Sequence, residues 1–431
     1  MMKPLKIALA GLGTVGAGLV KLLTDNAGII TARAGRPLQV VAVSARDRNR
    51  DRGIVLGAEV AWYDDAVKMA EQAECDVIVE VIGGSEGIAR HVVETALGRG
   101  LHVVTANKAL LAHHGVALAA TAEDKGVVLG FEAAVAGGIP IIKALKEGLA
   151  GNAISRVTGI LNGTCNYILT TMRETGRDFA DVLAEAQALG YAEADPSFDI
   201  DGVDAAHKLA ILTSLAFATP VDFQSMHVEG IRHVSAVDID FADKLGYRIK
   251  LLGIAQATDH GIEQRVHACM VPVAAPIATV DGVFNAVVAE GDFVGRSIYE
   301  GRGAGAGPTA SAVAADIIDI ARGNRSPAFG VPVAALVARP AASMERRQGA
   351  YYMRLMVLDR PGVLADVATA LRAEGVSVEQ MIQPGRAPGE TVPMVMTLHD
   401  TVEADMNRAV ARIAALDAVV EKPRLIRIEP L

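Results

Sequence analysis

The stretch Lys6-Ile-Ala-Leu-Ala-Gly-Leu-Gly-Thr-Val-Gly16 indicates how the first part of this chain folds. A short apolar run typical of a buried strand leads directly into a glycine turn, and a helical pattern begins at Ala17. In a strand–turn–helix unit, such glycines permit a tight turn and bring the backbone close to a pyrophosphate at the helix N-terminus. We therefore expect a dinucleotide-binding turn rather than a plain glycine turn, with contacts from Gly11, Leu12, Gly13, Thr14, Val15 and Gly16.

The same alternation of strand and helix continues as far as residue 131. Strands are predicted at the short apolar runs 6–10, 38–43, 76–81, 101–104 and 127–129, with helical spacing between most of them. Strands that alternate with helices are joined by right-handed crossovers and form a mostly parallel sheet. The sequence therefore predicts an α/β fold whose first domain, residues 1–131, is a Rossmann-type dinucleotide-binding domain.

Two further units follow the first. Long Ala-rich helical stretches (139–149, 179–189 and 203–217) precede an apolar strand-like run around 266–273, which predicts an α+β catalytic domain over residues 132–322. Residues 323–348 are rich in Pro, Arg and Ala and are interpreted as a linker. Residues 349–431 show the order βαββαβ, which is the ferredoxin-like arrangement.

Composition excludes several classes of protein. The chain carries 41 Lys and Arg against 50 Asp and Glu, for a net charge of −9, so it lacks the basic surface that nucleic acids require. No uncharged apolar run reaches the roughly 18 residues of a membrane helix. The three cysteines show neither a disulfide framework nor zinc-ligand spacing. We therefore expect a soluble cytoplasmic protein that acts on a small molecule, with neither nucleic acid nor membrane as a partner.

The residues after the second predicted strand bear on which dinucleotide is bound. NAD enzymes usually place an acid there to accept from the ribose 2′-hydroxyl, whereas an Arg suits the 2′-phosphate of NADP. Here the strand is followed by Ser44, Arg46 and Asp47. Arg46 favours NADP, and Asp47 keeps NAD as an alternative. A solvated basic loop without a role is the other interpretation.

Two further motifs carry candidate catalytic groups. Thr105-Ala-Asn-Lys108 follows a strand at the carboxyl edge of the sheet, where ligands bind, although an ordinary lysine at a helix start is the alternative. The run from Gly190 to Lys208 places four acids in a loop and then enters an apolar helix. In that helix Asp204 and Lys208 are four residues apart, so they share one face and can pair.

Together these motifs resemble those of homoserine dehydrogenases with a C-terminal ACT domain, over essentially the whole chain. The resemblance implies NAD(P)-dependent, reversible reduction of L-aspartate 4-semialdehyde to L-homoserine, on the route to threonine, methionine and isoleucine. It implies that Lys208 is the proton donor and acceptor, with Asp204 as its partner. Lys108 would lie between the nicotinamide and the substrate.

The resemblance also implies substrate-binding residues. Glu193 and Asp199 would hold the substrate, with Glu193 at the amino group of homoserine. Thr164 would face the substrate from the run Leu161-Asn-Gly-Thr-Cys-Asn166, which without the family would be only a turn signal.

Further positions follow from the resemblance for the cofactor and for a cation. Thr105 and Gly303 would contact the cofactor, Gly303 from a glycine loop whose helix, about 308–322, returns to the first domain with Pro308 at its first position. A sodium ion would be bound by hard oxygen ligands. These ligands would be the Glu132 carboxylate and the backbone carbonyls of Val135, Gly137 and Ile139.

Two other functions stay open on the sequence alone. A different NAD(P)-dependent semialdehyde dehydrogenase would need an activated cysteine, and only Cys165 is near the predicted site. A non-catalytic dinucleotide or amino-acid sensor would keep the fold, but it would have no need of the paired Asp204 and Lys208.

The C-terminal unit suggests assembly and regulation. The segment Asp359-Arg-Pro-Gly-Val-Leu-Ala-Asp366 resembles the ligand loop of ACT domains, and the resemblance makes threonine the first candidate effector. The exposed edge of such a sheet commonly pairs with a second copy, which predicts a homodimer or homotetramer. An assembly module without an effector is the alternative.

Overall fold

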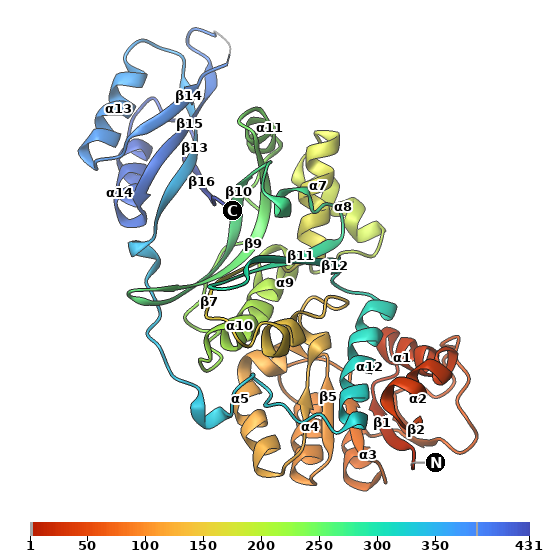
Figure 1. Cartoon of the computed structure of the whole chain (residues 1–431). Helices are drawn as coiled ribbons and strands as arrows, with labels where there is room; N and C mark the ends of the chain where they lie inside the picture. The colour runs from red at the N-terminus through yellow and green to blue at the C-terminus, as the bar shows by residue number, and fades with distance from the viewer. Residues whose placement is uncertain (1–2, 385–386) are drawn as a thin grey trace.

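The computed structural model describes residues 3–384 and 387–431 (Figure 1). Its N-terminal part is a six-stranded parallel sheet in the order β3-β2-β1-β4-β5-β6. This is the strand order of Rossmann-type domains, so the predicted α/β fold with a parallel sheet is confirmed. The strands are β1 (Leu5–Ala10), β2 (Leu38–Ser44), β3 (Ala61–Tyr63), β4 (Val77–Glu80), β5 (His102–Thr105) and β6 (Leu129–Gly130). The helices among them are α1 (Thr14–Asp25), α2 (Ala27–Ala34), α3 (Ala66–Gln72), α4 (Ile88–Gly98) and α5 (Lys108–Asp124).

Alternate residues of the central strands pack on opposite faces of this sheet. Ile7 and Leu9 of β1 belong to the hydrophobic cluster that includes α1, whereas Ala8 and Ala10 belong to the cluster on the other face. All four side chains are completely buried. A strand that is covered on both faces has a continuous apolar sequence, which is why these strands could be predicted.

Helix α12 (Ala306–Arg322) returns from the middle of the chain and packs along α1 (Figure 1). The contact is close at Gly18, where an added Cβ would lie 2.9 Å from the carbonyl oxygen of Ala306. The helix begins at Ala306, so the prediction that Pro308 is its first residue was wrong; Pro308 is the third. Proline is still tolerated there because the N–H groups of the first turn have no partner within the helix.

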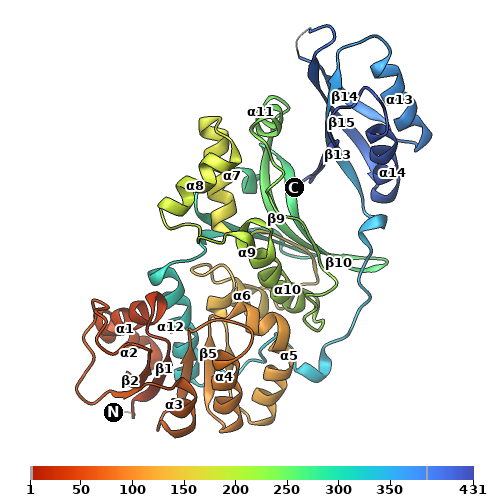
Figure 2. The same cartoon turned by 180° about the vertical axis from the view of Figure 1, so that it is seen from behind.

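A second, ten-stranded sheet has the order β12-β11-β7-β9-β10-β16-β13-β15-β14, with β8 beside β10. Its first part is largely antiparallel and consists of β7 (Ile154–Ile160), β8 (His227–Val228), β9 (Tyr247–Thr258), β10 (Gly261–Pro272), β11 (Phe284–Gly291) and β12 (Gly295–Arg302). The helices of this part are α6 (Ile141–Lys143), α7 (Gly163–Thr175), α8 (Phe179–Ala188), α9 (Ser197–Ile200), α10 (Val203–Phe217) and α11 (Ala236–Lys244), seen from behind in Figure 2. The predicted helices at 179–189 and 203–217 are present. The predicted helix at 139–149 is split into α6 and a π-helical turn at 144–148.

The C-terminal unit continues the second sheet. Its elements are β13 (Gln348–Leu358), α13 (Val363–Ala373), β14 (Val378–Ile382), β15 (Thr391–Val402), α14 (Glu403–Ala414) and β16 (Arg424–Ile428), in the predicted βαββαβ order. β16 pairs antiparallel with β13 and parallel with β10, through Cys269 opposite Arg427 and Met270 opposite Ile428. One strand therefore joins the C-terminal unit to the middle of the chain.

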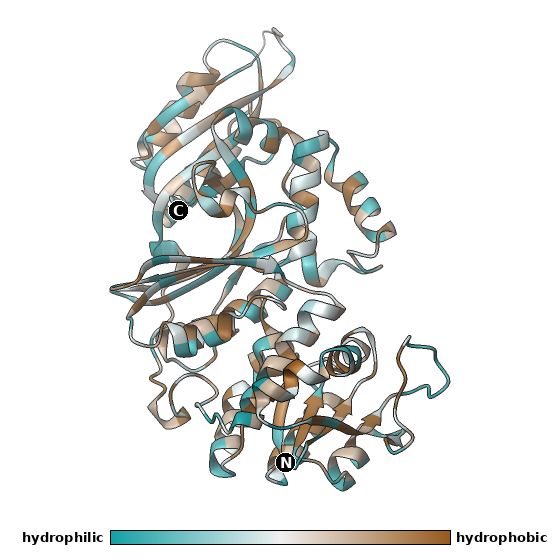
Figure 3. Cartoon of the chain, turned by 45° about the vertical axis from the view of Figure 1, so that its right-hand side comes forward, coloured by the Kyte–Doolittle hydropathy of each residue, from teal (hydrophilic) through white to brown (hydrophobic). Residues whose placement is uncertain are grey.

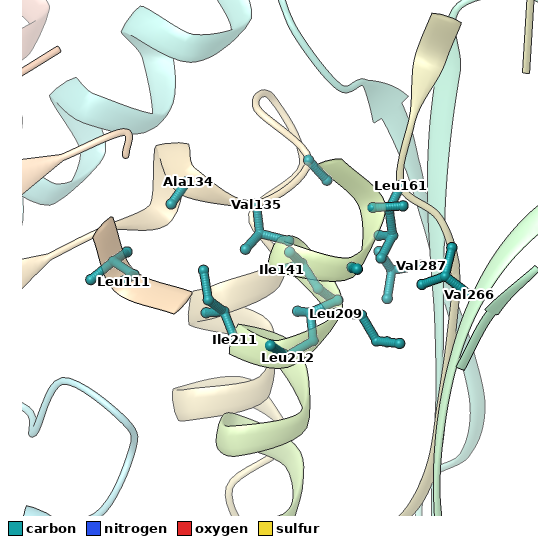
Figure 4. Packing of buried hydrophobic residues seen from close by; sticks show 14 of the residues in the cluster. Leu111, Ala134, Val135, Ile141, Leu161, Leu209, Ile211, Leu212, Val266 and Val287 are labelled. Carbon is teal, nitrogen blue, oxygen red and sulfur yellow. The ribbon is translucent and has the colours of Figure 1, made fainter. Parts of the chain in front are cut away.

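Helix α10 lies at the centre of the largest hydrophobic cluster. Every residue from Asp204 to Ser214 is buried. Figure 4 shows Leu209 and Leu212 of this helix among apolar side chains of the second sheet and of the segments beside the first. Apolar residues also concentrate on the strands of the first sheet (Figure 3). Among the described residues, no helix is both long enough and apolar enough to cross a membrane.

The packing of α12 on α1 can be tested at two helical glycines. Gly18→Ala should destabilise the fold by about 1–3 kcal/mol, because its new methyl group meets the backbone of Ala306. Gly28→Ala in α2 is the control: an added Cβ there has no atom within 4 Å, so alanine should be neutral or stabilise by about 0.5–1 kcal/mol. Urea unfolding followed by Trp62 fluorescence measures both. A Gly18→Ala variant as stable as the wild type would contradict the close packing.

Candidate active site

A cavity of about 660 Å³ lies at the carboxyl ends of the parallel strands, between the two sheets. Open α/β sheets bind ligands at this edge. The walls come from the glycine turn, the loops after β4 and β5, helix α10 and the glycine loop before α12. A concave site with few, convergent polar groups is the expected form of an active site. The predicted site residues that line it are Val15, Lys108, Gly137, Thr164, Asp199, Asp204, Lys208 and Gly303.

Glycine is sterically required at both ends of the glycine turn. Gly11 has a φ of +105°, and an added Cβ would lie 2.9 Å from the Val81 carbonyl oxygen. An added Cβ at Gly16 would lie 2.1 Å from the carbonyl oxygen of Gly11. Gly13 caps α1 without a side chain, which leaves the first N–H groups of the helix to a ligand. The turn therefore has the form that a pyrophosphate requires.

The predicted cofactor-selecting residue, Arg46, lies on an exposed loop after β2. The neighbouring Arg52 fixes this loop, because its Nε donates to the Leu12 carbonyl oxygen at 2.8 Å and its Nη2 to the Asp47 carbonyl oxygen at 2.5 Å. Arg52 also lies 5.6 Å from the centre of the Trp62 ring. The loop thus holds Arg46 in solvent next to the glycine turn.

Lys108 is the first residue of α5, and the buried Glu80 orders the loops beside it. The Glu80 carboxylate accepts hydrogen bonds from the N–H groups of Ile82 and Gly83, at 2.7 and 2.9 Å. It also accepts one from the Thr105 hydroxyl at 2.5 Å. Thr105 is completely buried and does not line the cavity. Its hydroxyl therefore supports the turn that carries Lys108, and only its backbone remains for a cofactor.

The carboxylate of Asp204 joins two ammonium groups. Its Oδ2 lies 2.7 Å from Nζ of Lys208, and its Oδ1 lies 3.0 Å from Nζ of Lys108. Lys208 also donates to the Leu161 carbonyl oxygen at 2.7 Å. Lys208 and Asp204 are only 8% and 5% exposed, whereas the Lys108 side chain is 34% exposed. The pairing expected from the four-residue spacing is present, and Lys108 adds to it from the first sheet.

Asn162 orients both acids of the cavity. Its Nδ2 donates to Oδ1 of Asp199 at 2.8 Å and to Oδ2 of Asp204 at 2.9 Å. Its Oδ1 accepts from the N–H of Cys165 at 2.8 Å and so caps α7. Because the cap fixes which end of the amide faces the helix, the donor end must face the two carboxylates. Asn162 therefore holds two like charges side by side.

The pKa values of Asp204 and Asp199 are shifted in opposite directions. Burial alone would raise the pKa of Asp204, but the charges of Lys208 and Lys108, with hydrogen bonds from Lys208 and Asn162, hold that pKa well below its usual value. Burial raises the pKa of Asp199 above its usual value. Two carboxylates whose pKa values are pushed apart in one cavity are a feature of catalytic sites.

The predicted substrate residues are only partly brought together. Thr164 lines the cavity and donates its hydroxyl to the Tyr191 carbonyl oxygen at 2.7 Å, and Asp199 also lines the cavity. Glu193 has an exposed side chain and is not among the lining residues. The carbonyl oxygen of Glu193 accepts from Nε2 of Gln187 at 3.0 Å, which holds its loop against α8.

The segment predicted to bind a cation begins with a buried acid. Glu132 is 2% exposed, and its two oxygens accept from the N–H groups of Ile142 and Lys143, both at 2.9 Å. Burial and the charge of Asp316 raise the pKa of Glu132 to about 7. The chain then turns sharply, with φ of 53° at Ala136 and 44° at Gly137. Of the predicted ligands, Gly137 lines the cavity, whereas Glu132, Val135 and Ile139 are buried behind it.

The cysteines do not have the environment of a nucleophile. Burial raises the pKa of Cys165 well above its usual value and raises that of Cys75 to about 11. Burial likewise raises the pKa of Cys269. The Sγ of Cys165 donates to the carbonyl oxygen of Asp199 at 3.3 Å. Since the thiolate is the reactive form, none of the three cysteines, all within the described residues, is activated as a thioester mechanism needs.

Three residues that organise the site were missed from the sequence. Asn107 caps α5 by accepting from the N–H of Leu110 at 3.0 Å, and Asn162 caps α7. An Asn directly before a helical pattern is a cap signal, so both could have been found. Glu80 carried no such signal, because an acid at the end of an apolar strand is ordinary until its loop partners are known.

Comparisons with known proteins find the same family on both sides of the cavity. The family described as "Homoserine dehydrogenase, NAD binding domain" matches residues 11–132, and the family "Homoserine dehydrogenase" matches residues 140–318. A homoserine dehydrogenase of Neisseria gonorrhoeae is 48% identical over 436 aligned residues that cover 100% of both chains. The solved homoserine dehydrogenase of Thiobacillus denitrificans matches with a TM-score of 0.93 and 47% identity, over 100% of this chain and 99% of that one.

A more distant solved structure is a hyperthermophilic archaeal homoserine dehydrogenase in complex with NADPH. It matches with a TM-score of 0.63 and 29% identity, over 74% of this chain and 97% of its own. With 48% identity over its full length and family matches on both sides of the cavity, the chain belongs to the homoserine dehydrogenase family, whose members are oxidoreductases acting on a CH–OH group.

Proposed function

We propose that the 660 Å³ cavity is where the chain reversibly reduces L-aspartate 4-semialdehyde to L-homoserine, with Lys208 as the group that transfers the proton. The observation that carries this assignment is the buried Asp204 carboxylate held between the ammonium groups of Lys208 and Lys108. A bound nicotinamide cofactor supplies or takes up the hydride, and the protein positions the reactants and moves the proton.

Lys208 has one N–H left for the substrate. An ammonium group has three donors. Two of them are used, one on Asp204 and one on the Leu161 carbonyl oxygen. The third donates to the aldehyde oxygen, which gains negative charge as the hydride reaches its carbon, and then gives it the proton. In the reverse direction the neutral amine accepts the proton of the homoserine hydroxyl.

Lys108 and Asp204 set the charge around that oxygen. The two ammonium groups place positive charge beside the forming alkoxide, which stabilises it. Because the low pKa of Asp204 keeps it ionised, the carboxylate does not compete with Lys208 as a proton donor. Asn162 holds the carboxylate in place for both lysines.

The amino and carboxylate groups of the substrate require further partners. We assign Asp199 and Thr164, which line the cavity, to substrate binding. We assign Glu193 to the substrate ammonium group, which requires its loop to turn toward the cavity. Gly190, at the start of this loop, already has a φ of +75° and supplies the backbone freedom.

NADP is the cofactor that the residues favour. The glycine turn offers N–H groups to a pyrophosphate, Gly303 lines the cavity, and the buried Thr105 precedes the lining residues Ala106 and Asn107. The exposed Arg46 is the group for a 2′-phosphate. The archaeal relative in complex with NADPH agrees with this choice. NAD is the alternative that Asp47 keeps open.

The loop from Glu132 to Ile139 is the proposed site for a monovalent cation, with sodium as the first candidate. A buried acid whose pKa is raised to about 7 lacks a full counter-charge, and a cation would supply it. A carboxylate and backbone carbonyls are the hard oxygen ligands that such an ion prefers. Glu132 and the carbonyl oxygens of Val135, Gly137 and Ile139 would hold it, and the ion would stiffen the wall of the cavity.

We propose that the chain has four parts, of which the second and the last share the second sheet. Residues 1–131 with helix α12 form the dinucleotide-binding domain, 132–322 the catalytic domain, 323–348 a linker and 349–431 an ACT domain. The βαββαβ order of the last unit supports its assignment. β14 is an exposed edge strand, which favours a homodimer or homotetramer that forms through this unit. The proposed location of the protein is the cytoplasm.

The loop between β13 and α13 is the proposed threonine site. Gly362 is the N-cap of α13, with a φ of +97° and no side-chain cap, so N–H groups are available to a carboxylate. An assembly unit without an effector is the alternative.

Lys208→Ala should lower kcat by the roughly 10²–10⁴ that is typical of losing a general acid, while cofactor binding survives. The matched control is Lys244→Ala, which breaks an exposed pair of the same spacing with Asp240 on α11 and should leave kcat unchanged. NADPH oxidation with aspartate semialdehyde measures the rate, and fluorescence titration measures NADPH binding. Near-normal turnover in Lys208→Ala would refute the assignment.

Arg46→Ala should raise the KM for NADPH several-fold and leave that for NADH nearly unchanged, because only NADPH carries the 2′-phosphate. Arg50→Ala, on the same exposed loop, is the control for a general loss of positive charge. Steady-state kinetics with both cofactors distinguish the two effects. Equal losses with NADPH and NADH would show that Arg46 only supports the loop.

Gly362→Ala should abolish inhibition by threonine, because alanine is strained at a φ of +97° and the loop would rearrange. Gly375→Ala is the control, since this glycine lies at the other end of α13 with a φ of +69° and equal space around it. Both variants keep the full chain, because removing β16 would expose the edge of β10. Threonine titration of the activity is the measurement. A wild type that does not respond, or variants that respond equally, would leave assembly as the role of this unit.

A further inference from the structure

An exposed phenylalanine lies beside the lysine that α5 contributes to the candidate active site. Phe198 is the second residue of α9 and is 42% exposed. The centre of its ring lies 5.8 Å from Nζ of Lys108, which is positioned over the ring. A cation within about 6 Å of the centre of an aromatic ring is attracted by the negative charge on its face. The two side chains therefore form a cation–π interaction.

Lys108 has few other contacts that could fix its ammonium group. Its side chain is 34% exposed, whereas Lys208 is buried. Nζ of Lys108 lies 3.0 Å from Oδ1 of Asp204, and this is its only ion pair with a described residue. A lysine carries its charge on a flexible four-carbon chain, and an ion pair that is open to solvent restricts that chain only weakly. The ring of Phe198 is the second contact that keeps the ammonium group beside Asp204.

The neighbours of Phe198 in the chain are held on both sides. Nη2 of Arg232 donates to the hydroxyl oxygen of Ser197 at 2.9 Å. Nδ2 of Asn162 donates to Oδ1 of Asp199 at 2.8 Å. Because both flanking side chains are fixed, the backbone of this short helix has one orientation, and it directs the ring of Phe198 toward α5.

Three further rings extend the contact of Phe198 into an aromatic cluster. The ring centre of His207 in α10 lies 5.5 Å from that of Phe198 and 4.5 Å from that of Phe223. The ring centre of His113 in α5 lies 5.4 Å from those of both His207 and Phe223. Aromatic rings at these separations attract each other beyond the burial of their surface. Because His113 belongs to α5 and His207 to α10, the cluster joins the two helices that carry the lysines of the site.

The ring at the centre of this cluster is uncharged at neutral pH. His207 is 5% exposed, and burial together with the charge of His113 lowers the pKa of His207 to about 4. Nδ1 of His207 is buried and has no hydrogen-bond partner among the described residues, so no acceptor stabilises a proton there. A protonated ring would repel the ammonium group of Lys108. The uncharged ring can therefore pack against Phe198 while Lys108 stays close to both.

We propose that Phe198 is a positioning residue for the dehydrogenase reaction, because its ring holds the ammonium group of Lys108 beside Asp204. Phe198 is not among the residues that line the cavity, so it acts through Lys108 and does not bind the substrate. Without the ring, the ammonium group spends less time where it can stabilise the forming alkoxide. This inference rests on the proposed role of Lys108, which is tested by a variant of its own.

Phe198→Leu keeps an apolar side chain but removes the ring. It should lower kcat with aspartate semialdehyde and NADPH roughly two- to fivefold, the loss expected for a cation–π contact at a partly exposed site. The KM for aspartate semialdehyde should change less than kcat, because the alkoxide forms only during the reaction. Phe198→Tyr keeps the ring and should retain the kcat of the wild type. Phe293→Leu, which removes a 90% exposed ring from the turn between β11 and β12, is the matched control and should have no effect.

A double-mutant cycle with Lys108→Met shows whether the ring acts through the lysine. Lys108→Met should itself lower kcat, because it removes positive charge beside the forming alkoxide. Adding Phe198→Leu to Lys108→Met should then cause no further loss. A ring that only stabilises α9 would instead lower kcat by the same factor in both backgrounds. The melting temperature of every variant, measured on the same samples, shows that each one is folded.

Three results would overturn the inference while the role of Lys108 stands. These are a wild-type kcat in Phe198→Leu, equal losses in Phe198→Leu and Phe198→Tyr, and an effect of Phe198→Leu that is undiminished in the Lys108→Met background. A wild-type kcat in Lys108→Met would overturn the proposed role of Lys108 and the inference with it. The measurement on Lys108→Met therefore separates the failure of the one from the failure of the other.

Discussion

The ionised carboxylate of Asp204 connects the two halves of the candidate active site. It binds Lys108, which begins a helix of the parallel sheet, and Lys208, which lies on the helix that packs against the second sheet. A buried carboxylate is costly unless charges and hydrogen bonds compensate it, and here two ammonium groups and the Asn162 amide do so. Each lysine is therefore held at its position by a carboxylate that it shares with the other lysine, and the distance between the two walls of the cavity depends on how the two sheets meet.

Helix α10 makes this arrangement rigid. Its residues from Asp204 to Ser214 are all buried, and Leu209 and Leu212 lie in the core between the sheets (Figure 4). The helix cannot turn about its axis without exposing apolar surface, so Asp204 and Lys208 keep one orientation. Preorganised charges of this kind stabilise a transition state without moving during the reaction. The burial of α10 therefore both stabilises the core and fixes the orientation of Asp204 and Lys208.

The parallel sheet and the Asp204–Lys208 pair could be predicted from the sequence because local signals carry them. Strands such as 6–10 are continuous apolar runs between glycine turns, and a four-residue spacing on an apolar helix places two side chains on one face. In the second sheet, the strands β7, β8, β9, β11 and β12 were missed. β12, for example, exposes Arg296, Ile298, Glu300 and Arg302 on one face and only half buries Ser297, Tyr299 and Gly301 on the other, so it has no apolar face of its own. Its pairing with β11 is a long-range property that no local pattern reveals.

The details of the site depended on contacts between distant segments. Glu80 acquires its role only when the loop at 82–83 and Thr105 lie beside it. Pro308 was placed two residues too early in its helix, because Gly305 with a φ of +116° and not the proline marks the helix start. Glu193 matches a family motif, yet its side chain is exposed and does not line the cavity, although Gly190 and Tyr191 of the same loop do.

The pairing of β16 with β10 has a consequence for how the protein is made. β10 ends at Pro272 and its partner strand ends at Ile428, so the ribosome must add 156 residues after one before the other is complete. At a synthesis rate of about 5–20 residues per second, the edge of β10 stays unpaired with β16 for roughly 8 to 30 s. An unpaired edge is a template for other chains during that time, which makes nascent polypeptides on one messenger prone to pair with each other. We therefore expect the edge of β10 to be open to mispairing until β16 has been made.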